Sequence, residues 1–189
     1  MFVKIAVNNG GPYRAKNMET EAIRIAIVMQ RTLLTSRWQT HQWRPIEVVA
    51  DAMLAEGAAR CLRDDAADTR WLFPGFDIKL FSDEAEGYYL NVSSPTPCWF
   101  VMWRFEELDG VEIAVPKSVT LSYNEAARLM DGGEQVDTLP AAPDIIESLA
   151  AFTQTHYQPE VKRKRKKPSF EGGAGVDAMA KAEDGAHGR

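Results

Sequence analysis

The stretch Ile23–Gln30, with the sequence IRIAIVMQ, does most to set the fold class. Every second residue from Ile23 to Met29 is a large apolar one, which is the period of a half-buried β-strand. The run Ile46–Ala50 has the apolar and β-branched composition of a second strand. We expect these two strands to pair as an antiparallel hairpin.

Further strands are predicted in the middle of the chain. The apolar run Cys98–Trp103 is typical of a central strand that is covered on both faces. Val111–Val115 would be its antiparallel partner, and Val119–Leu121 would end the sheet region. The dipeptide Pro74-Gly75 stands between two apolar runs, so it predicts a turn.

Three helices are expected between and after these strands. The first would begin at Ser82 or Asp83 as its N-cap, and the second at a capping box of Ser122 and Glu125. The third has Pro143 near its first turn. Because strands come first and helices then mix with strands, we predict an α+β fold with a mostly antiparallel sheet. An apolar stripe on the third helix consists of Ile145, Leu149, Phe152 and His156.

The length of 189 residues predicts one folded domain, which we place at residues 21–158. The charge distribution sets the C-terminal end apart from this domain. Residues 1–160 hold 14 Lys and Arg against 23 Asp and Glu, whereas residues 161–189 hold 8 against 4. We expect residues 159–189 to be a disordered tail, since they cannot bury enough apolar surface to fold. Residues 1–20 are interpreted as a disordered extension or an upstream-start artefact, with Met18 as the alternative start.

Several protein classes are disfavoured by the composition. An acidic body argues against a nucleic-acid-binding surface, because phosphate contacts need a basic face. The sequence has no apolar run near the roughly 20 residues that a membrane helix needs, and its N-terminus does not resemble a signal peptide. The two cysteines, Cys61 and Cys98, are far apart in the sequence and form no C-x-x-C motif. This cysteine usage is typical of a protein whose thiols stay reduced. We therefore expect a cytoplasmic protein with no membrane contact.

The window Ser36–Pro45, SRWQTHQWRP, is the candidate binding site. It concentrates two tryptophans, two arginines and a histidine in ten residues. Tryptophan and arginine are the residue types most enriched at binding hot spots, which favours a recognition surface. The alternative is structural: the tryptophans pack on the sheet, and the arginines stack over them or pair with acidic groups. The candidate residues are Arg37, Trp38, His41, Trp43 and Arg44.

The sequence contains no motif that indicates a catalytic site, a metal site or a cofactor site. His41, His156 and His187 do not have the spacing of metal ligands. The glycine pair in Asn8–Gly11 lacks the lysine and hydroxyl of a phosphate-binding loop. There is no G-x-S-x-G nucleophile motif. We therefore predict no catalytic residue, no metal site and no cofactor.

Several of these motifs resemble an uncharacterised bacterial domain family. Its members are often encoded beside molybdenum-dependent formate dehydrogenases, and some are labelled molybdopterin-guanine dinucleotide biosynthesis proteins. The resemblance covers roughly residues 22–168 and implies a role in maturation or function of a molybdenum enzyme; it carries over no catalytic residues. The matching segments are Ser36–Trp38, Trp43–Pro45, Ser122–Ala126, Asp131–Glu134 and Lys162–Lys167.

The leading hypothesis is an accessory or adaptor protein for a molybdenum-dependent formate dehydrogenase. Its partner would be a formate dehydrogenase subunit or a maturation factor. One alternative is an enzyme or carrier of the molybdopterin-guanine dinucleotide cofactor, with a pocket near Arg37, His41 and Arg44. Another is nucleic-acid binding through the tail alone. A basic run would steer or dock the partner, or would serve only solubility; it comprises Lys162, Arg163, Lys164, Arg165, Lys166 and Lys167.

Overall fold

The computed structural model describes residues 22–51, 53–108 and 110–159, and these form an α+β domain. The predicted fold class is confirmed: two antiparallel sheets are combined with three α-helices. The predictions for residues 1–20 and for Lys162–Lys167 lie outside the described residues. The elements are β1 (Ile23–Leu33), β2 (His41–Val49), β3 (Arg60–Arg63), β4 (Asp68–Ile78), a 3-10 turn η1 (Ser82–Glu84), α1 (Ala85–Val92), β5 (Cys98–Leu108), β6 (Val111–Thr120), α2 (Tyr123–Asp131), β7 (Gln135–Pro140) and α3 (Pro143–His156).

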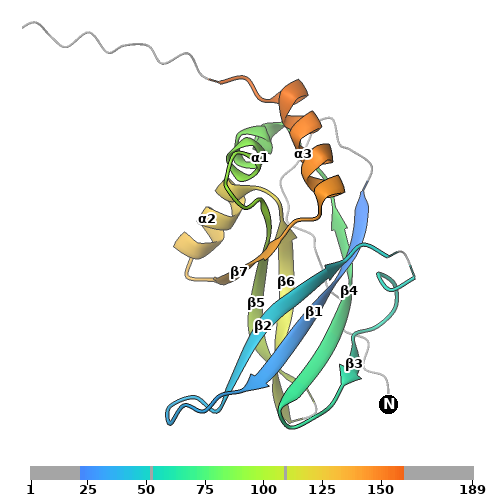
Figure 1. Ribbon diagram of the computed structural model, residues 1–189, viewed down its shortest axis with the longest axis vertical. Coiled ribbons are helices and arrows are strands. Elements are labelled where there is room, and N and C mark those ends of the chain that lie inside the picture. The colour runs from blue at the N-terminus through green and yellow to red at the C-terminus, as the bar shows by residue number, and fades with distance from the viewer. Residues whose placement is uncertain (1–21, 52, 109, 160–189) are drawn as a thin grey trace, which may run out of the picture. The chain divides into compact units, whose positions relative to one another are not determined.

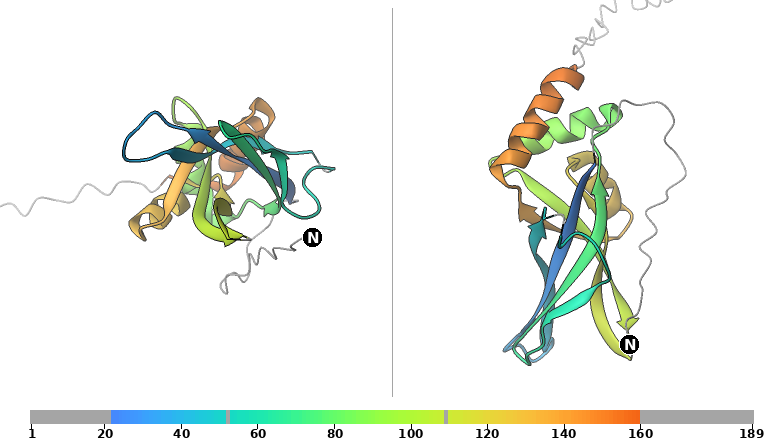
Figure 2. Two further views of the ribbon diagram at one scale, coloured as in Figure 1. Left: turned by 90° about the horizontal axis from the view of Figure 1, so that it is seen from below. Right: turned by 90° about the vertical axis from the view of Figure 1, so that its right-hand side faces the viewer.

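Two sheets pack against each other, and the helices gather at one end of them (Figures 1 and 2). The first sheet has the order β2-β1-β4-β3, and the second has the order β6-β5-β7. Side chains from both sheets share one core, because Ile27 and Met29 of β1 cluster with Val101 and Trp103 of β5. The strand ends opposite the helices are joined by the β1–β2, β3–β4 and β5–β6 connections (Figure 1).

The helices extend the core at their end of the sheets. Tyr88 of α1 meets Phe152 of α3 edge to face, with ring centroids 5.8 Å apart. The predicted cap of α2 is present, because the Glu125 N–H donates to Ser122 Oγ at 3.1 Å. The predicted cap of the first helix is wrong. A 3-10 turn precedes α1, and neither it nor α1 has a side-chain cap.

The first hairpin is confirmed, but its second strand is longer than predicted. β2 begins at His41 rather than at Ile46, because β1 continues to Leu33 and pairs with His41 there. The window Ser36–Pro45, which we call the Trp/Arg window, is therefore divided between the connection at residues 34–40 and the first half of β2. This division decides where each side chain of the window lies.

The predicted turn at Pro74-Gly75 is wrong, because both residues lie inside β4. The pairing of β4 with β1 shifts register between Ile25 and Ile27, so the proline and glycine form a bulge. Gly75 has a φ of 95°, and its N–H donates to Ala55 O at 3.1 Å, outside the sheet. Proline has no N–H to donate to a neighbouring strand, and a bulge leaves its position out of the hydrogen-bond ladder. The strand can therefore bend at Pro74 and continue.

The sheet region does not end at Leu121, contrary to the prediction. After α2 the chain returns as β7, which pairs with β5 over Cys98–Trp103. β7 is an edge strand of half-buried and exposed residues that ends at Pro140, so its local sequence signal is weak. Its position beside β5 completes the second sheet and places Asp137 next to the core.

Candidate functional site

The connection between β1 and β2 carries Arg37 and Trp38 at the end of the domain opposite the helices (Figure 1). The side chain of Trp38 is 95% exposed, and Arg37 is exposed as well. Backbone contacts fix the connection: the Leu34 N–H donates to Thr40 O at 2.8 Å. The Trp38 N–H also donates to Ser36 Oγ at 3.2 Å. The indole is thus presented to solvent on an ordered turn, which we call the hairpin tip (residues 34–40).

Trp43 does not belong to that exposed surface. It is only 7% exposed and lies in the core shared by the two sheets. The reason is its register, since Trp43 pairs with Arg31 on the inward face of the first sheet. The Arg31 guanidinium carbon lies 6.0 Å from the centroid of the Trp43 ring. Trp43 therefore packs on the sheet, as the structural alternative expects. The arginine beside its ring is Arg31 of β1, which lies outside the window Ser36–Pro45.

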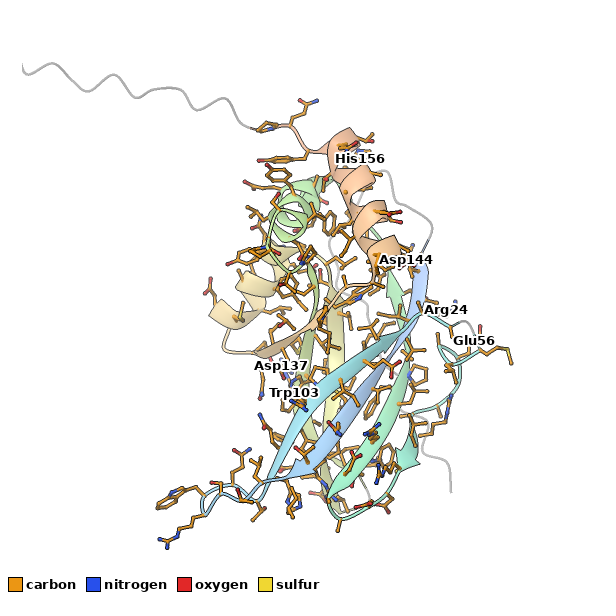
Figure 3. The ribbon with its side chains drawn as sticks, viewed as in Figure 1. Arg24, Glu56, Trp103, Asp137, Asp144 and His156 are labelled. Atoms are coloured by element: carbon orange, nitrogen blue, oxygen red, sulfur yellow. The ribbon has the colours of Figure 1, made fainter. Side chains whose placement is uncertain are left out.

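His41 and Arg44 lie in separate surroundings. His41 is half-buried, and its Nδ1 lies 3.0 Å from Thr40 Oγ1. Arg44 is exposed and lines an open groove of about 430 Å³ between β2 and β7. Asp137 lines the same groove and accepts a hydrogen bond from Trp103 Nε1 at 2.7 Å (Figure 3). Neither Arg37 nor His41 is among the residues that line this groove.

The hairpin is cationic on an otherwise acidic chain. Residues 22–46 include four arginines and no aspartate or glutamate, against a net charge of −5 for the whole chain. Arg24 is neutralised by ion pairs to Asp77 and Glu56, and the pair with Glu56 is seen in Figure 3. Within the described residues no ion pair engages Arg37 or Arg44. The outer half of the hairpin therefore presents unneutralised positive charge.

A second cavity lies between the two sheets, and sequence reasoning missed it. Its volume is about 400 Å³, and it opens among β1, β2, the β3–β4 region and the β5–β6 hairpin. Arg31 is its main charged donor. Arg31 Nη2 donates to Thr69 Oγ1 at 2.9 Å, and Arg31 Nε is buried with no hydrogen-bond partner in the described part of the chain. Its lining includes Arg31, Trp43, Cys61, Asp64, Thr69 and Trp71.

A sequence signal for Arg31 existed in the strand period. Continuing the alternation of Ile23–Met29 by one step places Arg31 on the core face of β1. An arginine at an inward strand position is rare unless it is paired, so it points to a special environment. The cavity itself could not be predicted, because it forms only where the second sheet packs over this face of β1.

The described residues include two free cysteines, Cys61 and Cys98. Burial raises the pKa of the Cys61 thiol, and it does the same to the pKa of the Cys98 thiol. Both thiols therefore stay protonated at neutral pH. No group of three or more His, Cys, Asp or Glu in the described ranges is placed to hold a metal ion. None of the helices there is both long and apolar enough to cross a membrane.

The sequence matches a family described as protein of unknown function (DUF3305) over residues 24–166. The chain belongs to the DUF3305 family. No curated protein and no solved structure matches the chain. The DUF3305 region includes the hairpin tip, the groove beside Arg44, the cavity at Arg31 and all three helices.

Proposed function

We propose that this DUF3305 protein is an accessory or adaptor protein that binds another protein through its hairpin tip. The observation that carries the proposal is the 95% exposure of Trp38 on a turn held by backbone hydrogen bonds. A tryptophan buries about 150–250 Å² in an interface, which corresponds to a gross gain of about 4–6 kcal/mol. The ordered turn lowers the entropy that binding must remove, so more of this gain remains as affinity.

The charge around Trp38 defines the kind of partner. Arg37 directly precedes Trp38 in the sequence, and Arg44 lies on the same hairpin with no acidic residue between the two arginines. Such a surface is complementary to an apolar pocket with an acidic rim. The rim charges would mainly set the association rate and the orientation, and the indole would supply most of the affinity.

We further propose that the partner is a subunit of a molybdenum-dependent formate dehydrogenase or one of its maturation factors. The support for this is the motif resemblance given above, whereas the DUF3305 match supports family membership alone. The basic run Lys162–Lys167 would accelerate the encounter with an acidic partner by long-range attraction.

The test is capture from the native cell with the full-length protein as bait. Wild type, Trp38→Ala and Arg37→Ala are compared, and Leu90→Ala is the matched control because Leu90 is an exposed apolar residue on α1. We expect wild type and Leu90→Ala to recover a formate dehydrogenase subunit or maturation factor. Trp38→Ala should recover much less of this partner, because loss of a hot-spot side chain weakens binding by about thirtyfold or more.

Thermal melts of the same variants separate binding from folding. Since both tip side chains are exposed, Trp38→Ala and Arg37→Ala should melt within a few degrees of wild type. Equal recovery by Trp38→Ala and wild type would show that the tip is not the docking site. Loss of the cooperative melt would show instead that the tip residues serve folding.

A further inference from the structure

We propose that the cavity at Arg31 is a binding site for a small aromatic or heteroaromatic carboxylate. The cavity lies between the two sheets and is lined by a guanidinium, two indoles and a carboxylate. Its volume of about 400 Å³ is at the lower end of the range for small-molecule sites. The proposal concerns a free ligand, so it goes beyond protein binding at the hairpin tip and does not depend on it.

The need for an anion comes from Arg31. An arginine is charged at every accessible pH and has five N–H donors. In the described residues its guanidinium makes no ion pair, and its one hydrogen bond is from Nη2 to Thr69 Oγ1. Nε is buried and lacks a partner. A carboxylate bound there would supply both the missing acceptor and the missing counter-charge, and it matches the planar geometry of the guanidinium.

The position of Arg31 is fixed before any ligand binds. Thr69 is almost fully buried, accepts from Arg31 and in turn donates its own hydroxyl proton to Asp65 O at 2.9 Å. Thr69 also pairs directly with Arg31 in the β1–β4 register. The guanidinium is thus held by a neighbouring strand and is pre-organised for recognition.

The aromatic part of the ligand follows from the walls of the cavity. Trp43 and Trp71 stand on the two strands that flank β1, and both line the cavity. Two indoles offer flat apolar surface to a planar ring. Asp64 also lines the cavity, and no ion pair joins it to Arg31 within the described residues. Its carboxylate can accept a hydrogen bond from an O–H or N–H group on the ring, so a hydroxylated or N–H-bearing acid fits best.

The experiment uses the full-length protein and two matched probes, 4-hydroxybenzoate and its neutral analogue 4-hydroxybenzamide. Binding is measured by calorimetry and by the indole N–H signals of the five tryptophans in a ¹H–¹⁵N spectrum. We expect 4-hydroxybenzoate to bind at millimolar concentrations or below and to shift the Trp43 and Trp71 signals. The Trp38 and Trp99 signals should stay in place, because neither residue lines the cavity. The amide should bind at least about tenfold more weakly, since it lacks the charge.

Two variants of the arginine and one control test the assignment. Arg31→Gln should weaken binding of the acid by about tenfold to hundredfold, and Arg31→Lys should weaken it less because the charge remains. Arg44→Gln is the matched control, since Arg44 lies on the same hairpin but lines the other groove. Should Arg31→Gln unfold, the Arg31→Lys variant and the wild-type spectra still decide the matter. Absence of saturable binding, equal binding of acid and amide, or shifts at Trp38 in place of Trp43 and Trp71 would each overturn the proposal.

Discussion

At the residue scale, the polar side chains of the first sheet are organised around Asp68. Asp68 Oδ1 accepts from Gln30 Nε2 at 2.7 Å, and Oδ2 accepts from Arg63 Nη1 at 2.9 Å and from Arg70 Nη2 at 2.8 Å. These partners come from β1, β3 and β4, so one carboxylate links three strands. The Arg70 guanidinium first, and then the Gln30 amide, hold the pKa of Asp68 below its usual range.

Replacing Asp68 by Asn should therefore lower stability in a pH-dependent way. A carboxylate with a depressed folded-state pKa stabilises the protein above its unfolded-state pKa of about 3.9, and this contribution is lost as the pH falls through the folded-state value. The urea midpoint of Asp68→Asn should lie below that of wild type near neutral pH. The difference should shrink at about pH 3. An identical difference at both pH values would contradict a role for the Asp68 charge.

Trp103 gives a second prediction at this scale, because its ring is buried and its Nε1 donates to Asp137. Trp103→Phe should cost about 2–4 kcal/mol of unfolding free energy, since it removes a charge-assisted hydrogen bond and leaves a cavity. The same substitution at the exposed Trp38 should change stability by about 0.5 kcal/mol or less. Chemical denaturation of both variants measures this contrast. Equal losses at the two positions would mean that the core assignment of Trp103 is wrong.

At the element scale, α1 and the start of α2 approach each other at a glycine. A Cβ added to Gly87 would lie 2.1 Å from Ser122 Oγ and 3.2 Å from Asn124 N. Ser122 is fully engaged there, because it caps α2 and donates to the Glu84 carboxylate at 2.7 Å. The close approach of the two helices therefore depends on the missing side chain.

A double-mutant cycle tests this helix contact. Gly87→Ala should destabilise the protein by about 1–3 kcal/mol through overpacking, and Ser122→Ala by about 1 kcal/mol through loss of the cap. The double variant should be more stable than the sum of the two losses predicts, because removing Oγ relieves the clash. Denaturation midpoints give the coupling. Strictly additive losses of unfolding free energy would show that a side chain at position 87 does not clash with Ser122.

The elements also show what could be predicted from the sequence. β1 and the apolar β5 were found because period and composition are local signals, and so was the cap at Ser122. The strand β7 was missed because its identity comes from pairing with β5, a contact distant in the sequence. The bulge at Pro74-Gly75 was mistaken for a turn, since the same dipeptide serves both and only the pairing with β1 distinguishes them.

At the scale of the whole molecule, the packing of the two sheets determines which side chains of the Trp/Arg window are buried and which are exposed. From the sequence, Trp38 and Trp43 could either share a recognition surface or pack on the sheet. The register sends Trp43 into the core and leaves Trp38 on the tip. The cavity at Arg31 exists only because a second sheet closes over the first. Long-range packing therefore separates a pattern that is continuous in the sequence into an exposed tip and a side chain that lines a cavity between the sheets.

The basic run gives a prediction that belongs to the full chain. Changing all six residues of Lys162–Lys167 to Gln removes six positive charges from a region distinct from the hairpin tip. Association with the partner should slow and lose much of its salt dependence, whereas dissociation should stay nearly constant. Stopped-flow or surface-based kinetics over a range of ionic strength measure both rates. A faster dissociation with unchanged association would assign the run to the bound interface rather than to steering.

A photocrosslinking experiment decides whether the hairpin tip docks on a partner. The photoreactive residue p-benzoyl-phenylalanine replaces the exposed Gln39, which follows Trp38 on the hairpin tip, in the full-length protein in its native cell. In a separate variant it replaces Leu90 on α1. We predict a discrete adduct with a formate dehydrogenase subunit or maturation factor from position 39, and none from position 90. An adduct that forms only at position 90, or no adduct at position 39, would contradict docking through the hairpin tip.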